Sequence, residues 1–218
     1  MAAVCTLAEE KAPEPVADPR PFLEELEHKM TSVRSVYLEF TQERQLKLFT
    51  EPLRTEGAML IEKPDRIRWQ TTTPFGSILL ADHQSVAQFE QTDGEWKKLK
   101  VGFPQLLRRL MEQMVLMHQG KVGALTSDFS VSVATGAVAV VTLVPKDKNV
   151  RATLASLAVR MEPDFSATRE VIMNEPGGDL TRIVFRNERR DVNYPAGTFD
   201  QAKPLALEAV RAALGHAH

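Results

Sequence analysis

The side chains of this chain that could perform acid–base, nucleophilic or metal chemistry are few and widely separated. The histidines are His28, His83, His118, His216 and His218, and only the last two have a spacing that suits a shared metal ion. Asp82 precedes His83 and could begin a catalytic triad, but a polar turn at a strand end is the favoured interpretation. No nucleophile elbow, zinc-protease, P-loop or dinucleotide motif is present. We therefore expect no enzyme activity, no metal site and no cofactor.

Charge and cysteine content narrow the possible functions further. The net charge is −2, so no overall field attracts the chain to nucleic acid, and we expect no nucleic-acid partner. Cys5 is the only cysteine, which excludes an intramolecular disulfide and a thiolate metal site. The basic run Arg186–Arg190 is expected to be a solvated strand end rather than a phosphate site.

Residues 57–74 are expected to form a hairpin around which the rest of the chain is organised. The segment 58–61 is an apolar run of one strand's length. Pro64 cannot donate a hydrogen bond to a sheet, so a turn is expected at Lys63–Asp65. Residues 66–70 then alternate, so Ile67 and Trp69 face one side of the strand and two arginines face the other. The apolar side must be buried against either a core or a ligand.

Short strand-like segments continue on both sides of this hairpin. Strands are expected near residues 36–40, 77–81, 85–91, 129–133, 137–144, 154–161, 168–174 and 180–187, with 43–53 either a strand or a loop. Tight turns are expected at 92–94 and 177–179. Amphipathic helices are expected at 22–30 and 104–118, and an alanine-rich helix at 205–214. This pattern is typical of an antiparallel sandwich or barrel rather than of βαβ units.

The N-terminal residues carry no periodic pattern. Residues 1–8 are small and mostly apolar, and they are either the remnant of an export signal or a loose start of the chain. Residues 9–21 contain four prolines among charges and are expected to be a linker without structure of its own.

Several short fragments agree in order and spacing with a known family. They are Phe40-Thr41-Gln42, Gly57 through Lys63-Pro64, Arg66-Ile67-Arg68-Trp69, Pro74-Phe75, Leu80-Ala81-Asp82, Leu143-Val144-Pro145-Lys146, Gly178-Asp179-Leu180-Thr181, Phe185 to Asn187, and Phe199. Over roughly residues 22–200 the chain resembles the LolA family of periplasmic lipoprotein carriers. The division that follows is a linker at 1–21, a LolA-like domain at 22–200 and a C-terminal helix and tail at 201–218.

The resemblance implies both a fold and a function. The fold is a mostly β, unclosed and strongly curved antiparallel barrel, with α-helices covering its open concave face. The function is a periplasmic carrier that takes the acyl chains of lipoproteins from an inner-membrane ABC transporter to an outer-membrane acceptor. In the family, a basic residue before the hairpin proline helps to hold the helical lid shut. That position is Lys63 here, a point charge without the planar fork of arginine.

The expected lipid-binding residues are the apolar side chains of the sheet and of the lid. They are Leu38, Phe40, Met59, Ile61, Ile67, Trp69, Ile78, Leu80, Leu107, Leu110, Met111 and Met114. Methionine suits a surface that must repack around mobile chains. An acylated lipoprotein or another acyl lipid is the expected partner of a monomeric protein. The alternative is a non-catalytic binding or sensor module on the same scaffold, or a carrier for a different lipid.

Overall fold

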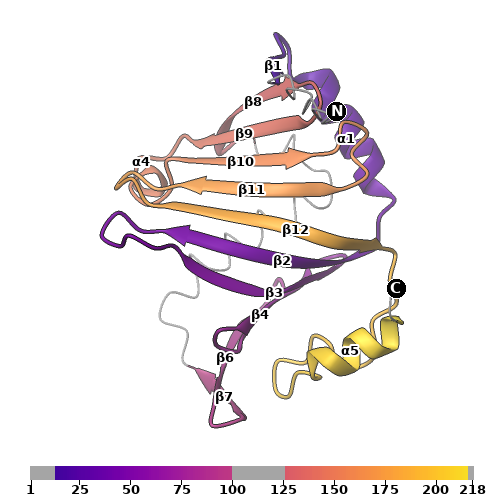
Figure 1. The fold of residues 1–218 in the computed structure, drawn as a ribbon. Helices are drawn as coiled ribbons and strands as arrows, with labels where there is room; N and C mark the ends of the chain where they lie inside the picture. The colour runs from indigo at the N-terminus through magenta and orange to yellow at the C-terminus, as the bar shows by residue number, and fades with distance from the viewer. Residues whose placement is uncertain (1–12, 100–125, 216–218) are drawn as a thin grey trace, which may run out of the picture.

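One antiparallel sheet contains every strand in the part of the chain that the structure describes. The structure is a computed structural model, and it describes residues 13–99 and 126–215. Within these ranges the strand order is β1-β8-β9-β10-β11-β12-β2-β3-β4-β5-β6-β7. The sheet is curved and does not close (Figure 1), which confirms the mostly β, unclosed antiparallel fold expected from the sequence.

The strands fall into two consecutive sets along the chain. The first set is β1 (Glu14–Pro15), β2 (Ser35–Gln45), β3 (Leu53–Glu62), β4 (Arg66–Thr73), β5 (Ser77–Ala81), β6 (Val86–Thr92) and β7 (Glu95–Leu99). The second set is β8 (Phe129–Thr135), β9 (Ala139–Pro145), β10 (Ser156–Met161), β11 (Thr168–Asn174) and β12 (Leu180–Arg190). The two sets join where β12 pairs with β2, from Leu180 opposite Gln45 to Arg190 opposite Val36, and β1 pairs with β8 at the edge of the second set.

Three helices accompany the sheet in the described residues, namely α1 (Arg20–Thr31), α4 (Lys148–Arg151) and α5 (Leu207–Leu214). A proline at the start of α1 suits the first helical turn, where the missing N–H would have no partner. The helix α4 was not expected from the sequence, and it forms because the Asp147 side chain accepts hydrogen bonds from the backbone N–H groups of Asn149 and Val150. The helix expected at 104–118 lies outside the described residues.

The expected turns occur at the positions that the sequence indicated. The chain reverses between β3 and β4 at residues 63–65, and between β6 and β7 at Asp93–Gly94, where both residues have positive φ angles of 55° and 82°. Glycine and aspartate tolerate this left-handed backbone better than most residues do. The ambiguous segment 43–53 resolves into the end of β2, a turn at 46–52 and the start of β3. The short strand β1 was missed, because it lies in the segment expected to be a linker.

The two faces of the sheet follow from its register. Directly opposed residues lie on the same face, so Leu38, Met59 and Trp69 share one face while Leu60 and Arg68 share the other. We call the face that α1 contacts the inner face and the opposite face the outer face. The helix α1 packs on β8–β10 from the inner side, and α5 packs on β2 and β3 from the outer side (Figure 1).

Candidate functional site

The inner face of β2–β5 is lined by apolar side chains in two adjacent rows. One row runs from Leu38 through Met59 and Trp69 to Leu79, one residue from each strand. The other row consists of Val36, Ile61, Ile67 and Ala81. Because each row crosses four strands without a polar residue, the inner face presents a continuous apolar strip.

The structure brings together six of the residues expected to bind lipid. They are Leu38, Phe40, Met59, Ile61, Ile67 and Trp69, and all belong to or pack against one cluster. Their inner-face neighbours were not predicted from the sequence, namely Leu79, Val86, Ile183, Phe185, Val171 and Met173. The residues Val171, Ile183 and Phe185 sit at alternate positions in two strands, and this spacing could have identified them.

An aromatic pair lies at the edge of this strip. The rings of Phe40 and Trp69 stack with their centroids 4.3 Å apart and their planes 30° apart. Gly57 lies opposite Phe40, and a Cβ atom there would come within 2.7 Å of the Phe40 ring and 1.9 Å of the Gln70 carbonyl oxygen. Only glycine therefore allows the Phe40 ring to lie over this part of β3. Trp69 remains partly buried rather than fully buried.

Two of the expected residues lie on the wrong face for this site. Ile78 pairs with Gln70 and Leu80 pairs with Arg68, so both point to the outer face. There they pack with Ala87 and Phe89. The expectation failed because the segment 77–81 is almost continuously apolar, so the sequence does not show which parity faces inward. The inward residues of β5 are Leu79 and Ala81.

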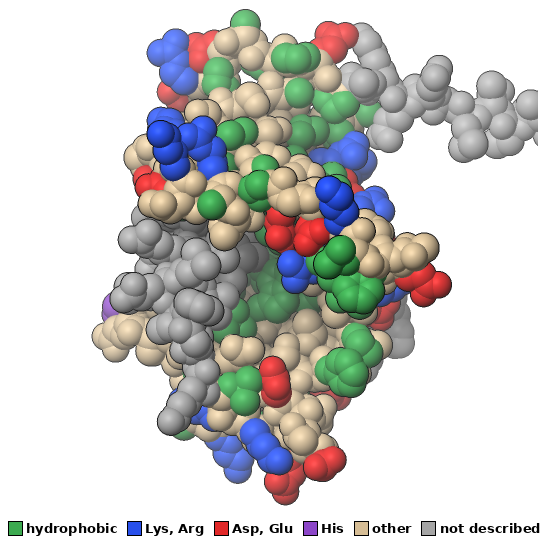
Figure 2. Space-filling view, turned by 90° about the vertical axis from the view of Figure 1, so that its left-hand side faces the viewer, with side chains coloured by type: hydrophobic (Ala, Val, Ile, Leu, Met, Phe, Trp, Pro, Cys, Tyr) green, Lys and Arg blue, Asp and Glu red, His purple; other side chains and the backbone are tan. Residues whose placement is uncertain are grey.

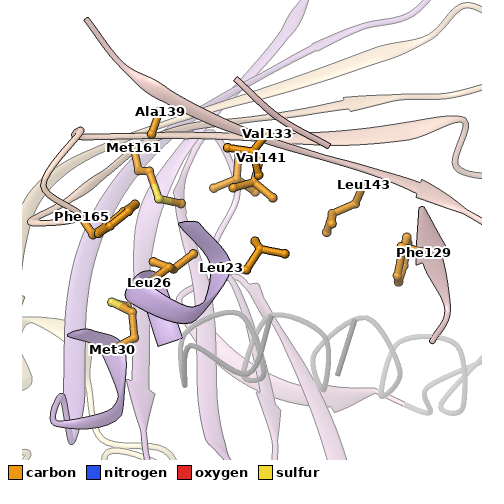
Figure 3. Packing of buried hydrophobic residues seen from close by; sticks show 11 residues of the cluster. Leu23, Leu26, Met30, Phe129, Val133, Ala139, Val141, Leu143, Met161 and Phe165 are labelled. Carbon is orange, nitrogen blue, oxygen red and sulfur yellow. The ribbon is translucent and has the colours of Figure 1, made fainter. Parts of the chain in front are cut away.

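The remaining four expected residues, Leu107, Leu110, Met111 and Met114, lie outside the described residues. Within the described residues, the inner face consists of the sheet strands and α1. Leu23, Leu26 and Met30 of α1 point toward Val133, Val141 and Met161 of the sheet (Figure 3). Val171 packs against this group and also against the Phe40 group, so the two apolar clusters are continuous across the inner face.

Polar contacts hold α1 at its C-terminal end. The Lys63 ammonium donates hydrogen bonds to the backbone carbonyls of Met30 and Thr31, each at 2.9 Å. These are among the last carbonyls of the helix, which lack helical partners and carry the negative end of the helix dipole. A lysine at the position expected for the lid contact is thus bound to the end of a helix on the inner face.

The β10–β11 turn holds the same helix from the other side. Lys29 donates to the carbonyl of Asp164 at 3.1 Å and lies over the Phe165 ring at 5.1 Å. Phe22 meets Phe165 edge-on at 4.7 Å. The helix is therefore attached to the sheet by an apolar stripe and by a few contacts near its ends.

A hollow opens at the end of the sheet that carries α4 and the turns 46–52, 74–76 and 175–179. We call this end the α4 end. Figure 2 looks at it and shows hydrophobic side chains at the base of the hollow, with acidic and basic side chains beside them. This arrangement offers an apolar floor with a polar rim, which suits a ligand with an apolar chain and a polar head.

A second recess, of about 430 Å³, lies between the end of β12 and the end of α5. Arg189 and Asp191 are among its lining residues, and the Arg189 guanidinium donates to the carbonyls of Leu214 and Gly215. The basic run 186–190 therefore anchors α5 and is not a purely solvated strand end. The polar lining of this recess does not suit an acyl chain.

The side chains that could perform catalysis do not converge in the described residues. His83 pairs with the carboxylate of Asp65, and its own side chain is 67% exposed. Burial raises the pKa of Asp82, but hydrogen bonds from the Gln84 and Ser85 backbone outweigh this effect and leave the pKa below its usual value. Asp82 is thus a polar turn residue, as expected. The described ranges contain no group of three or more metal-ligating side chains.

The outer face contains a buried cation that the sequence analysis did not identify. Arg68 is fully buried, and its guanidinium donates to the Gln70 side-chain oxygen and to the Thr198 carbonyl, the latter at 2.8 Å. Burial lowers its pKa to about 10, so it stays charged at neutral pH. Ala58, Leu60 and Leu80 are apolar residues on the same outer face as Arg68. In the sequence, their apolar character could have indicated that this face is covered too.

Comparisons with known proteins agree with this geometry. A sequence profile described as "Outer membrane lipoprotein carrier protein LolA" matches residues 31–202. No curated protein matches the chain. None of the helices in the described residues is long and apolar enough to cross a membrane.

Solved structures with a similar fold have low sequence identity to this chain. A LolA superfamily protein from Nitrosomonas europaea has a TM-score of 0.45 and 10% identity, covering 86% of this chain and 99% of that one. The lipoprotein LppX from Mycobacterium tuberculosis has a TM-score of 0.44 and 10% identity, covering 81% and 99%. MucB in the MucA/MucB complex of Pseudomonas aeruginosa has a TM-score of 0.37 and 13% identity, covering 84% of this chain and 61% of that one. The profile match extends over well over half of the sequence, so the chain belongs to the LolA family of outer-membrane lipoprotein carrier proteins.

Proposed function

We propose that this protein is a periplasmic carrier that binds the acyl chains of lipoproteins, or of related lipids, against the inner face of its sheet. The observation that supports this proposal most directly is the apolar strip across β2–β5, which continues into the cluster under α1. Within the described residues, no group of three or more potential metal ligands is found, and Asp82 serves a turn. Family membership supports the same class of function.

The magnitude of acyl-chain burial indicates why such a carrier needs a movable cover. Burying one methylene contributes about 0.8 kcal/mol, so an acyl chain of about 14 methylenes could contribute about 11 kcal/mol. A carrier that enclosed several chains completely would release them too slowly. Partial burial beneath a helix that can open allows both capture and release of the chain. The hydrogen bonds from Lys63 to the end of α1 would then set how readily this helix opens.

Transfer would follow a gradient of affinity between partners. The donor would be an inner-membrane ABC transporter and the receiver an outer-membrane acceptor, with this protein acting as a monomer between them. Lys63 would keep α1 closed while the cargo crosses the aqueous space.

A second candidate function is a binding or sensor module with a filled interior. The close stacking of Phe40 on Trp69 favours it, as does the deep burial of Ile61 and Ile67, which are 2% and 1% exposed. In such a module the inner face would be an ordinary core, and recognition would use another surface. A carrier for a lipid other than a lipoprotein would share the inner-face site and differ in its cargo.

Mass spectrometry of lipid extracted from the purified protein separates these functions. Copurified acyl lipid is expected for a carrier, and its mass identifies the lipid class. A protein that carries no acyl lipid, and that takes up none when offered acylated peptide, would be a binding module.

Substitution of an inner-face residue then locates the site. Trp69→Glu is better suited than Ile67→Glu, because Trp69 is only partly buried and its replacement disturbs the fold less. Uptake of a fluorescent fatty acid should be lost in Trp69→Glu. It should be retained in the matched control Val144→Glu, whose side chain is 37% exposed and points to the outer face. Equal uptake by both variants would place the site elsewhere.

A further inference from the structure

Large hydrophobic side chains are exposed on two turns at the α4 end. Leu48 is 93% exposed and Phe49 is 58% exposed on the turn between β2 and β3, and Phe75 is 80% exposed on the turn between β4 and β5. Leu53, at the start of β3, is 54% exposed. These four and Val144, near the end of β9, are the large exposed hydrophobic residues of the described chain, so such residues are concentrated at the α4 end.

The first turn is held in place by its neighbours. The Phe49 amide donates to the Leu46 carbonyl at 2.9 Å, and the Lys47 amide donates to the Asp179 carboxylate at 2.9 Å. Arg44 also pairs with Glu175 at 3.2 Å, so the turn is bound to the β11–β12 turn beside it. Because the backbone is fixed, Leu48 and Phe49 project outward as a stable tip.

The second turn is also fixed on both sides of its exposed ring. The Thr71 hydroxyl donates to the Phe75 carbonyl at 2.9 Å, and the Gln91 amide donates to the Gly76 carbonyl at 2.9 Å. A Cβ atom on Gly76 would lie within 3.1 Å of the Trp96 ring, so the backbone there packs closely against β7. The polar backbone is thus satisfied within the protein, while the Phe75 side chain is left in water.

Exposed cations lie at the same end of the sheet. Lys47 is on the first tip, while Lys148 and Arg151 are on α4 (Figure 1). None of these three side chains forms an ion pair with the residues that the structure describes. Of the nearby carboxylates, Glu175 is paired with Arg44, Asp147 and Asp179 accept backbone hydrogen bonds and keep their negative charge, and Glu51 is exposed. The three cations beside the first tip are therefore matched in number by three charged carboxylates, and the hydrophobic side chains are the distinguishing feature of this end.

We propose that the α4 end docks on the surface of a phospholipid bilayer, with Leu48, Phe49 and Phe75 inserted at the interface and Lys47, Lys148 and Arg151 against the headgroup phosphates. Apolar tips flanked by cations bind such an interface by combining burial of the tips with attraction of the cations to the phosphates. A bilayer accepts separate tips at any spacing, whereas a protein partner would need a matched pocket for each. This inference rests on the proposed function, because the hollow opens at the same end and an acyl chain could then enter from the bilayer.

Flotation with vesicles tests the docking surface. The purified full chain is mixed with vesicles of phosphatidylethanolamine and phosphatidylglycerol, and separately with vesicles of phosphatidylcholine alone. Binding to both kinds of vesicle is expected, and the double variant Leu48→Ser, Phe49→Ser should bind at least about tenfold more weakly. The control Gln84→Ser, at an exposed residue on the turn between β5 and β6 at the opposite end of the sheet, should bind as the unchanged chain does.

An environment-sensitive label gives a second measurement that does not depend on affinity. In a Cys5→Ser background, the label is attached at Leu48→Cys, at Phe75→Cys or, at the opposite end of the sheet, at Gln84→Cys. Its emission should shift to the blue with vesicles at the first two positions and stay unchanged at the third. The proposal would be overturned if the chain bound vesicles while the labels at positions 48 and 75 stayed in water. It would also be overturned if the chain did not bind vesicles and a folded protein bound the tips instead.

Uptake of a monomeric fluorescent fatty acid separates this inference from the proposed function. If the docking surface is assigned correctly, Leu48→Ser, Phe49→Ser should take up the free fatty acid normally and extract it from vesicles more slowly. If the unchanged chain takes up no free fatty acid but still binds vesicles through the tips, the carrier function fails and the docking surface stands. Normal extraction from vesicles by the double variant would overturn the docking role.

Discussion

The two faces of the same sheet bury similar apolar side chains but differ in how they are covered. On the outer face the C-terminal segment lies on β2–β6, with Leu207 and Val210 fully buried. Its polar contacts are partly or fully buried as well, since the Tyr194 hydroxyl donates to the Val36 carbonyl at 2.6 Å and the buried Arg68 donates to the Thr198 carbonyl. On the inner face, α1 is attached by an apolar stripe and by lysine contacts near its C-terminal end.

This difference indicates which cover can open. Lifting the C-terminal segment would take the Thr198 acceptor from the buried Arg68 guanidinium and break the bond of the partly buried Tyr194 hydroxyl, and each loss is costly. Burial also raises the pKa of Tyr194, so its hydroxyl stays protonated and keeps donating at physiological pH. Lifting the end of α1 returns an ammonium group and two carbonyls to water, where all three are solvated. The outer cover is therefore part of the permanent core, and the inner cover is the one suited to movement.

The largest expected effect comes from breaking the outer cover. Arg68→Ala removes the donors to Gln70 and Thr198 and leaves a cavity, so the free energy of unfolding should fall by about 3–5 kcal/mol. Urea unfolding measures this. The matched control is Arg66→Ala on the same strand and face, whose side chain is 50% exposed, and it should cost about 1 kcal/mol or less. Equal losses in the two variants would mean that the outer cover does not depend on the buried cation.

Adjacent residues on one strand give the most direct comparison of the two faces. Leu60 is fully buried on the outer face, and Ile61 is 2% exposed on the inner face. Truncation to alanine should cost about 2–4 kcal/mol of unfolding free energy at either position. Only Ile61→Ala should weaken binding of a fluorescent fatty acid, by about tenfold, because it removes about two methylene equivalents of contact. Similar loss of binding in Leu60→Ala would show that the inner face is not the distinct site.

The sequence alone predicted most of the sheet, because the turns and the alternation of side chains were explicit. The hairpin at 57–70, the Asp93–Gly94 turn and the C-terminal helix all occur where they were expected. The short helix α4 escaped prediction because a single Asp147 cap, rather than an apolar stripe, determines it. The strand β1 was missed because two residues cannot show a period.

The candidate site was only partly predictable for a different reason. Alternation assigns a face to Ile67 and Trp69, where polar residues mark the opposite side. It assigns none to Ile78 and Leu80, because the apolar run at 77–81 suits both faces and the register to β4 decides between them. The bonds from Lys63 to α1 join residues more than 30 positions apart, so no local pattern contains them, and the family resemblance supplied that expectation.

The inner cover can be loosened without disturbing the core. Lys63→Met removes the ammonium bonds to the Met30 and Thr31 carbonyls but keeps an apolar stem, so stability should fall by about 1 kcal/mol. If α1 must open for exchange, release of a bound fatty acid should become about tenfold faster, as stopped-flow transfer to acceptor vesicles would measure. Lys63→Arg keeps the charge and the donors and should release at close to the original rate. An unchanged release rate in Lys63→Met would indicate that lipid leaves by a route that does not involve α1.

The smallest expected effect concerns the edge where the outer cover meets the turn at 82–85. The Asp82 carboxylate accepts from the backbone of Gln84 and Ser85 and from the Gln201 side chain of the C-terminal segment. Asp82→Asn should therefore cost about 1 kcal/mol near pH 7, whereas Asp93→Asn, on an exposed turn, should cost almost nothing.

The pH dependence of this effect has a defined sign. The pKa of Asp82 is lower in the folded chain than its unfolded value near 3.9, so its contribution to stability is complete above the unfolded pKa. That contribution is lost as the pH falls through the folded pKa, because the protonated acid is a weaker acceptor. Urea unfolding at a series of pH values should then show the original chain and Asp82→Asn converging below about pH 4. A difference that stays constant into acid would mean that the turn and the C-terminal segment are held by shape alone, and that the outer cover owes nothing to this charge.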